Sequence, residues 1–133
     1  MFKKSKLIAI LIGITIIFSG CSNIPEEADS QYQKISAEEA KNMIDTDETV
    51  IVVDVRTPEE YNEGHIENAV LIPNETIIDE TPEQLPDLDA KILIYCRSGN
   101  RSQQAAEKLS ELGYTNVYDF GGIMDWPYET VTE

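Results

Sequence analysis

The chain has 133 residues, of which 25 are Asp or Glu and 10 are Lys or Arg, so its formal net charge at pH 7 is −15. Such an acidic chain is a poor partner for nucleic acid or for anionic lipid headgroups. Its length and its 41% of hydrophobic residues suit one compact domain with a short extension.

The first twenty residues are typical of an export signal. Three lysines precede an apolar run over residues 7–18, which is too short to span a bilayer, since a spanning helix needs about 20 residues. The run ends in a Phe-Ser-Gly-Cys sequence that resembles a bacterial lipobox, although Phe18 stands where that pattern prefers Leu. The resemblance implies that residues 1–20 are a lipoprotein signal peptide, removed before Cys21, and that the Cys21 sulfur is lipidated. The alternatives are an ordinary signal peptide and an uncleaved anchor.

Processing at this site would place the chain outside the cytoplasm, anchored by the lipid on Cys21 to the cell membrane of a bacterium. Loss of the three lysines would take the net charge from −15 to −18. Residues 21–31, which are acidic and contain a proline, predict a flexible tether. The chain has two cysteines, so Cys96 would be the only free thiol. An exposed thiol in an oxidising compartment would tend to oxidise, and its retention therefore favours a reactive role.

Strands and helices are expected to alternate through a single domain over residues 32–130. Residues 32–35 predict a short strand, and Ser36 with Glu39 predicts a capping box that opens a helix over residues 37–45. Residues 50–55 form a continuous apolar strand, of the kind that is buried on both faces of a sheet. Thr57 then predicts the cap of a short helix.

The second half of the chain continues the alternation. We expect a strand at 69–72, a helical turn at 75–79, an acidic loop at 81–89, a strand at 92–95, an amphipathic helix at 103–112 closed by Gly113, a strand at 116–118 and a short helix before residue 127. This order predicts an α/β fold with a largely parallel sheet between helical layers.

The segment around Cys96 carries the most chemical information. An apolar strand stops at this cysteine, and polar or small residues follow before a helix. Backbone N–H groups at such a helix start converge on one point, and the helix dipole adds roughly half a positive charge there. Arg97 and Arg101 add two guanidinium groups, so we expect an ionised, nucleophilic thiol beside an anion site. The alternative is a small buried cysteine in the core, but two arginines would be unusual beside an apolar pocket.

Four motifs, in order, resemble those of the single-domain rhodanese family. They lie at residues 53–61, 64–69, 95–102 and 121–126, and the resemblance extends over about residues 35–128. It implies a rhodanese-like α/β fold with a central five-stranded parallel sheet flanked by helices on both faces. It also implies a sulfurtransferase of the thiosulfate:cyanide type that needs no cofactor. The Cys96 thiolate would take the outer sulfur from a small anionic donor such as thiosulfate, and the resulting persulfide would pass it to a thiol or to cyanide.

The resemblance also assigns roles to the residues around the thiol. Catalysis is assigned to Cys96, and donor binding to the six residues that follow it: Arg97, Ser98, Gly99, Asn100, Arg101 and Ser102. Arg101 is expected to pair with the sulfonate of the donor, and Arg97 to point to the pocket mouth. Supporting roles are expected for Asp54, Arg56 and His65: the first two would fix the loops by hydrogen bonds or an ion pair, and His65 would bond backbone groups.

Other classes of function fit the sequence less well. The loop from Cys96 to Arg101 is one residue shorter than the phosphate cradle of protein tyrosine phosphatases, which suits sulfur better than a phosphate ester. One histidine and one free cysteine offer no ligand cluster for a metal. A non-catalytic binding module and a thiol redox relay stay open as alternatives. We expect a monomer.

Overall fold

The computed structural model describes residues 31–133. The predicted signal peptide, Cys21 and all but the last residue of the predicted tether lie outside the described residues. Within the described part, no helix combines the length and the apolar character needed to cross a membrane.

Strands and helices alternate along the described chain, as the sequence predicts. The strands are β1 (Tyr32–Lys34), β2 (Ile51–Asp54), β3 (Val70–Leu71), β4 (Ile92–Cys96) and β5 (Val117–Gly122). The α-helices are α1 (Ala37–Thr46), α2 (Pro58–Glu63) and α3 (Asn100–Glu111), and the short 3₁₀ helices are η1 (Asn74–Thr76) and η2 (Ile123–Asp125).

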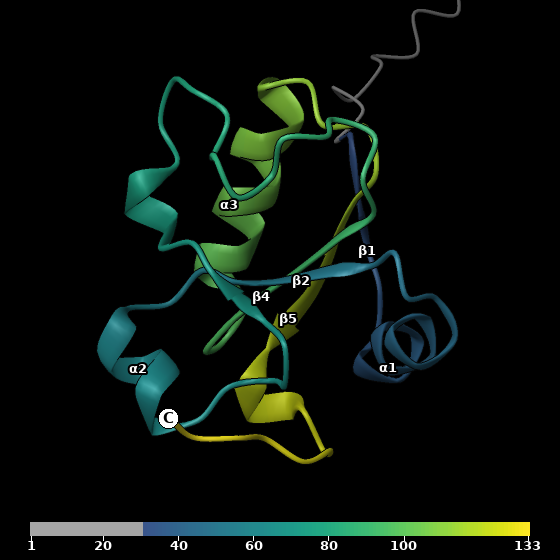
Figure 1. Ribbon diagram of the computed structural model, residues 1–133, viewed down its shortest axis with the longest axis vertical. Helices are drawn as coiled ribbons and strands as arrows, with labels where there is room; N and C mark the ends of the chain where they lie inside the picture. The colour runs from purple at the N-terminus through teal and green to yellow at the C-terminus, as the bar shows by residue number, and fades with distance from the viewer. Residues whose placement is uncertain (1–30) are drawn as a thin grey trace, which may run out of the picture.

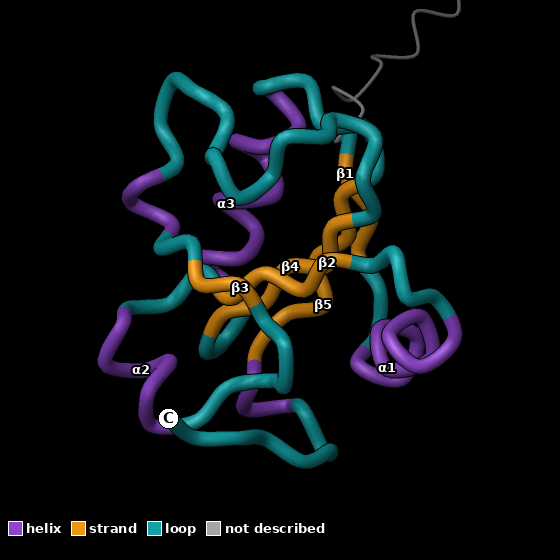
Figure 2. The backbone as a smooth tube through the Cα atoms, viewed as in Figure 1, coloured by secondary structure: helices purple, strands orange, loops and turns teal. Residues whose placement is uncertain are grey.

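The five strands form one parallel sheet in the order β1-β5-β4-β2-β3. Strand β4 lies at the centre, and all five of its residues are buried. Figures 1 and 2 show α3 on one side of the sheet and α1 and α2 on the other. The expected five-stranded parallel sheet with helices on both faces is therefore confirmed.

Alternate residues of β4 build two separate hydrophobic cores. Ile94 and Cys96 face the layer that contains α3, and Leu93 and Tyr95 face the layer that contains α1. This two-faced burial explains why the strand is a continuous apolar run in the sequence. It also fixes the direction of the reactive side chain, because Cys96 must point towards α3.

Local sequence signals fix the ends of several elements. The predicted capping box is present at α1, where Glu39 N donates to Ser36 Oγ and the Glu39 side chain accepts from Ser36 N. Gly113 closes α3 with a φ of 104°, the left-handed conformation expected of a C′ glycine.

The helical turn predicted at 75–79 is the shorter η1, which ends at Thr76, and two predicted boundaries next to the cysteine were also wrong. Helix α3 begins at Asn100 rather than at residue 103, because Gly99 caps it in a left-handed conformation. Strand β5 extends from residue 117 to Gly122, well past the predicted end at residue 118. Both differences lengthen the regular structure next to the cysteine.

Candidate active site

The candidate site lies at the edge of the sheet where β2 and β4 end. The two strands are neighbours and run parallel, so the segments that follow them emerge side by side. Asp54 ends β2 and Cys96 ends β4, and helix α2 starts four residues after Asp54. Ligand sites in open α/β sheets form at such carboxyl ends.

The thiol of Cys96 is enclosed by its own loop. Gly99 N donates a hydrogen bond to Cys96 Sγ over 3.0 Å, and the hydroxyl oxygen of Ser102 lies 3.6 Å from the same sulfur. Only 1% of Cys96 is exposed. The reason is its place on the central strand, with its side chain directed at the α3 layer. Although the sulfur is buried, it keeps polar contacts with Gly99 N and Ser102 Oγ, which a cysteine in an apolar core would lack.

The start of α3 shapes the loop around the sulfur. Gly99 has φ 106° and ψ −12°, a conformation that disfavours every residue with a side chain. Ser102 Oγ donates to Gly99 O over 3.0 Å and ties the first helical turn back to this cap. The free N–H groups and the positive end of the dipole of a 12-residue helix therefore lie beside Cys96. The loop can stabilise negative charge on a sulfur species without rearranging.

The end of β5 packs directly against the cysteine loop, a contact that was not predicted. A Cβ atom added to Gly122 would lie 2.2 Å from Arg97 O and 2.8 Å from Ser98 Cα. Met124 N then donates to Arg97 O over 3.2 Å. An irregularity in the β4–β5 register brings Gly122 opposite Cys96. The backbone after the nucleophile is thus held on a surface that only glycine permits.

Arg101 has a partner that was also missed. Its Nη1 and Nη2 donate to Glu60 Oε1 and Oε2 over 2.8 and 2.9 Å, in a bidentate ion pair across the two loops. The hydrogen bond to Glu60 raises the pKa of Arg101, burial opposes this shift, and the charges of Glu60 and Cys96 add to it. The side chain expected to bind the sulfonate of a donor is therefore close to the thiol but already paired.

Asp54 and Arg56 form the ion pair that the sequence predicts. Arg56 Nε donates to both Asp54 carboxylate oxygens over 3.0 and 3.1 Å, and its Nη2 donates to Asp54 Oδ2 over 2.6 Å and to Gly64 O over 2.7 Å. Burial lowers the pKa of Arg56, but the hydrogen bonds and charge of Asp54 outweigh it and leave the pKa raised. This pair ties the end of β2 to the end of α2.

His65 also contacts backbone groups, as expected. Its Nδ1 lies 2.8 Å from Tyr61 O, and its ring stacks on Tyr61 with centroids 3.7 Å apart. Its backbone bonds Val131 in both directions over 2.9 and 2.8 Å, which fastens the end of the chain to the turn after α2. Only 3% of the residue is exposed, and its described contacts are structural.

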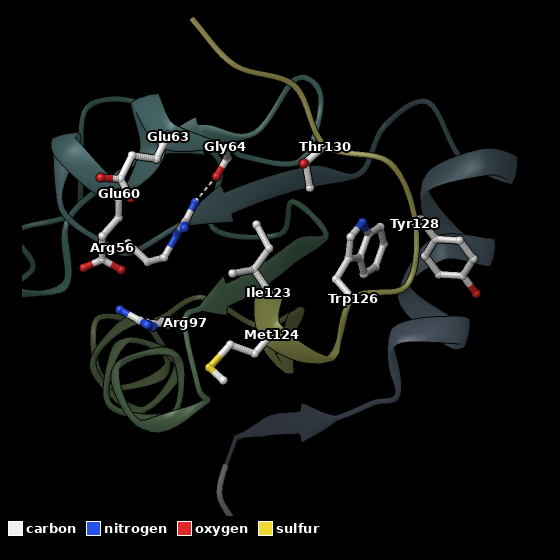
Figure 3. A pocket seen from close by; sticks show the side chains of 10 residues that line it. All are labelled: Arg56, Glu60, Glu63, Gly64, Arg97, Ile123, Met124, Trp126, Tyr128 and Thr130. Carbon is white, nitrogen blue, oxygen red and sulfur yellow. Dashed lines mark hydrogen bonds between the residues drawn. The ribbon is translucent and has the colours of Figure 1, made fainter.

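A pocket of about 420 Å³ includes Arg97, the residue that follows Cys96 in the chain, in its lining. Figure 3 shows charged side chains at one end of the pocket and apolar or aromatic ones at the other. Its lining comprises Arg56, Glu60, Glu63, Gly64, Arg97, Ile123, Met124, Trp126, Tyr128 and Thr130. Arg97 therefore lines this pocket, whereas Arg101 is not among its lining residues.

The remaining loop residues face a different hollow. Ser98, Gly99 and Asn100 line a space of about 330 Å³ on the side of β1 and β5, together with Lys34 and Asp119. Neither of these two depressions is lined by all six residues assigned to donor binding. In the described part of the chain, no group of three or more His, Cys, Asp or Glu side chains is arranged to hold a metal ion.

A signal for the two missed residues was present in the sequence. Glu60 belongs to the acidic first turn of a helix that follows the strand next to β4, and parallel strands bring such segments together at one edge. Gly122 is the second of two adjacent glycines, a pattern that indicates a close backbone approach. Neither signal identifies the partner, which is far away in the chain.

Comparison with known proteins gives a consistent result. The Rhodanese-like domain family matches residues 36–128. The thiosulfate sulfurtransferase PspE of Escherichia coli is 40% identical over 73 residues, which cover 55% of this chain and 70% of that protein. A solved structure described as a rhodanese with anions from E. coli is 36% identical, with a TM-score of 0.58, and the match covers 63% of this chain and 99% of that one.

A further relative has a different activity. The tRNA uridine(34) hydroxylase of Erwinia tasmaniensis is 34% identical over 116 residues, which cover 84% of this chain. The chain spans only about a third of that protein's length, namely 33%. The same domain therefore occurs in proteins with more than one named activity.

Proposed function

The chain belongs to the rhodanese-like domain family, and we propose that it moves sulfane sulfur from thiosulfate or a related donor to a thiophilic acceptor. The carrier is a persulfide on Cys96. The observation that supports the proposal most is the enclosure of Cys96 Sγ, which accepts the Gly99 N–H at 3.0 Å beside the start of α3.

The first step is attack of the Cys96 thiolate on the outer sulfur of the donor. With thiosulfate, the new S–S bond forms on Cys96, the S–S bond of the donor breaks, and its electron pair leaves with sulfite. The cysteine is left as a persulfide anion. Charge is conserved, because a monoanion and a dianion give a monoanion and a dianion. The Gly99 N–H and the helix dipole stabilise the negative sulfur throughout.

The second step returns the thiolate. A nucleophilic acceptor such as cyanide or a thiolate attacks the outer sulfur of the persulfide, and Cys96 leaves with the electron pair of the broken bond. A covalent intermediate between two half-reactions gives ping-pong kinetics. The apolar end of the pocket, with Ile123 and Met124, offers a surface for an organic acceptor next to Arg97.

We also propose that this chemistry takes place outside the cytoplasm. The support is the sequence of residues 1–21, with its basic start, its apolar run and its lipobox-like end. Cys21 would carry the lipid, and the acidic residues that follow would tether the domain to the membrane. A tethered acidic domain with a single free thiol suits sulfur transfer to small molecules near the cell surface.

Thiocyanate production tests the proposed activity. The full chain should form thiocyanate from thiosulfate and cyanide, and Cys96→Ser should abolish this reaction while the protein stays folded. Ser110→Ala is a matched control, because Ser110 lies on the far end of α3. Absence of turnover by the unchanged protein with thiosulfate, mercaptopyruvate and polysulfide would reject the proposal.

A further inference from the structure

We propose that Glu60 is a specificity-determining residue, which limits how much negative charge a sulfur donor can carry by occupying the guanidinium group of Arg101. The inference rests on the proposed sulfurtransferase function and adds a selection rule for the donor. This role would explain why a carboxylate, that of Glu60, lines a pocket that is expected to bind anions.

The geometry shows why Glu60 competes with a donor for Arg101. Both terminal nitrogens of Arg101 are used by Glu60, at 2.8 and 2.9 Å, and this fork geometry is the one with which Arg binds sulfonates and other oxyanions. Glu60 itself lines the pocket with Arg56 and Arg97 (Figure 3). An oxyanion that used both terminal nitrogens of Arg101 would have to displace Glu60.

The charges around the entrance nearly cancel. Arg56 is neutralised by Asp54, and Arg101 by Glu60. Among residues 31–133, the side chains of Arg97 and Glu63 take part in no ion pair, and both line the pocket. One free cation therefore faces one free anion. A dianion finds little net attraction here, and the acidic chain as a whole adds none.

The ion pair persists over the ordinary pH range. The hydrogen bond to Arg101 lowers the pKa of Glu60, burial works against this, and the charges of Arg101 and Arg56 add to the lowering. Glu60 therefore stays ionised at neutral pH and keeps Arg101 occupied. The exposed fractions of the two side chains, 31% for Arg101 and 24% for Glu60, leave the pair open to exchange with a ligand.

This arrangement distinguishes sulfur donors by their charge. Thiosulfate carries two negative charges, whereas an alkyl thiosulfonate carries one and delivers the same outer sulfur. In both cases Cys96 gains the outer sulfur, and the S–S electron pair leaves on sulfite or on a sulfinate. The repulsion by Glu60 scales with the donor charge, so the dianion suffers about twice the energetic penalty of the monoanion.

The test compares Glu60→Gln with the unchanged full chain, using thiosulfate and methanethiosulfonate as donors. Removing one charge near the donor should raise kcat/KM about tenfold for thiosulfate and about threefold for the monoanion, mainly through a lower KM. Glu59→Gln is the matched control, because it makes the same charge change on an exposed residue of α2 that does not line the pocket. Glu59→Gln should change kcat/KM by no more than about twofold for either donor, since a charge in water is strongly screened.

A second measurement needs no turnover. Iodoacetamide is uncharged and alkylates Cys96, and sulfate or methanesulfonate should slow this alkylation by occupying the anion site. Glu60→Gln and Glu60→Ala should both improve protection by sulfate more than protection by methanesulfonate. Because neither anion donates sulfur, this result holds or fails independently of the sulfurtransferase activity.

Two results would overturn the inference. One is an equal change for the dianion and the monoanion, which would make Glu60 a purely structural partner of Arg101. The other is a loss of thiosulfate or sulfate binding in both Glu60 variants, which would show that the paired Arg101 is the form that binds anions.

Discussion

Replacing Gly122 by Ala should move the cysteine loop without touching a reacting group. The added Cβ would lie 2.2 Å from Arg97 O and 2.7 Å from Arg97 C, and the nearest atoms are backbone atoms that cannot rotate away. Restoring an ordinary contact requires a displacement of about 1 Å. A displacement of ~1 Å at a catalytic group can cost about 10²-fold in rate. We therefore expect kcat/KM for thiosulfate to fall by about two orders of magnitude.

The cost in stability should be smaller than the cost in activity. Overpacking of this kind costs about 1–3 kcal/mol, so the Gly122→Ala protein should still fold. Gly113→Ala is the control, because Gly113 also has a positive φ, 104°, but lies at the far end of α3 with only Leu88 Cδ1 at 3.8 Å. It should lose stability through backbone strain and keep its activity. Thermal unfolding and thiocyanate formation, measured on both proteins, separate the two effects.

A folded Gly122→Ala protein with unchanged activity would contradict this expectation. It would mean that the loop tolerates a displacement of its backbone, and the close approach of Gly122 would then not be required. Equal activity losses in the two glycine variants would point to general destabilisation instead.

Three further predictions follow from the contacts and the leader. Arg101 lowers the pKa of Glu60, so their ion pair should stabilise the fold above pH ~4.5 and lose this effect as the pH falls through the lowered pKa. If Glu60→Gln does not change how the free energy of unfolding depends on pH, this prediction is wrong. The effect should be only about 0.5–1 kcal/mol, because the pair is partly exposed. Tyr95→Phe should cost about 1–3 kcal/mol in urea unfolding, since the buried Ile66 N–H loses its acceptor at 3.1 Å, and an unchanged midpoint would argue against that bond. Cys21→Ala should release the protein from the membrane fraction, and retention would count against lipidation.

Local patterns predicted most of the fold. The capping residues Ser36 and Glu39, the apolar run of β4 and the closing Gly113 each act within a few residues, so the sequence alone carries them. The start of α3 at Asn100 was not predicted because its N-cap, Gly99, is left-handed and has no side chain that could make a capping hydrogen bond. The predicted end of β5 fell short of Gly122 because the last residues of the strand pair with β4 beyond an irregularity in register.

The site was predictable in its nucleophile and not in its contacts. Cys96 and the helix behind it follow from one continuous stretch of sequence. The pairing of Arg101 with Glu60 joins residues 41 positions apart, and the contact of Gly122 with Arg97 depends on how β5 ends. Burial of Cys96 likewise depends on the strand order, which no single segment determines. Long-range partners of this kind decide which arginine is available to a substrate.

Persulfide formation on Cys96 is the step on which the proposed sulfur transfer depends. The direct measurement is mass spectrometry of the full chain after treatment with thiosulfate and removal of excess donor, followed by peptide mapping. We expect one added sulfur atom on the peptide that contains Cys96, and we expect cyanide to remove it again. No added sulfur with any sulfane donor, or an added sulfur that maps to another residue, would contradict it.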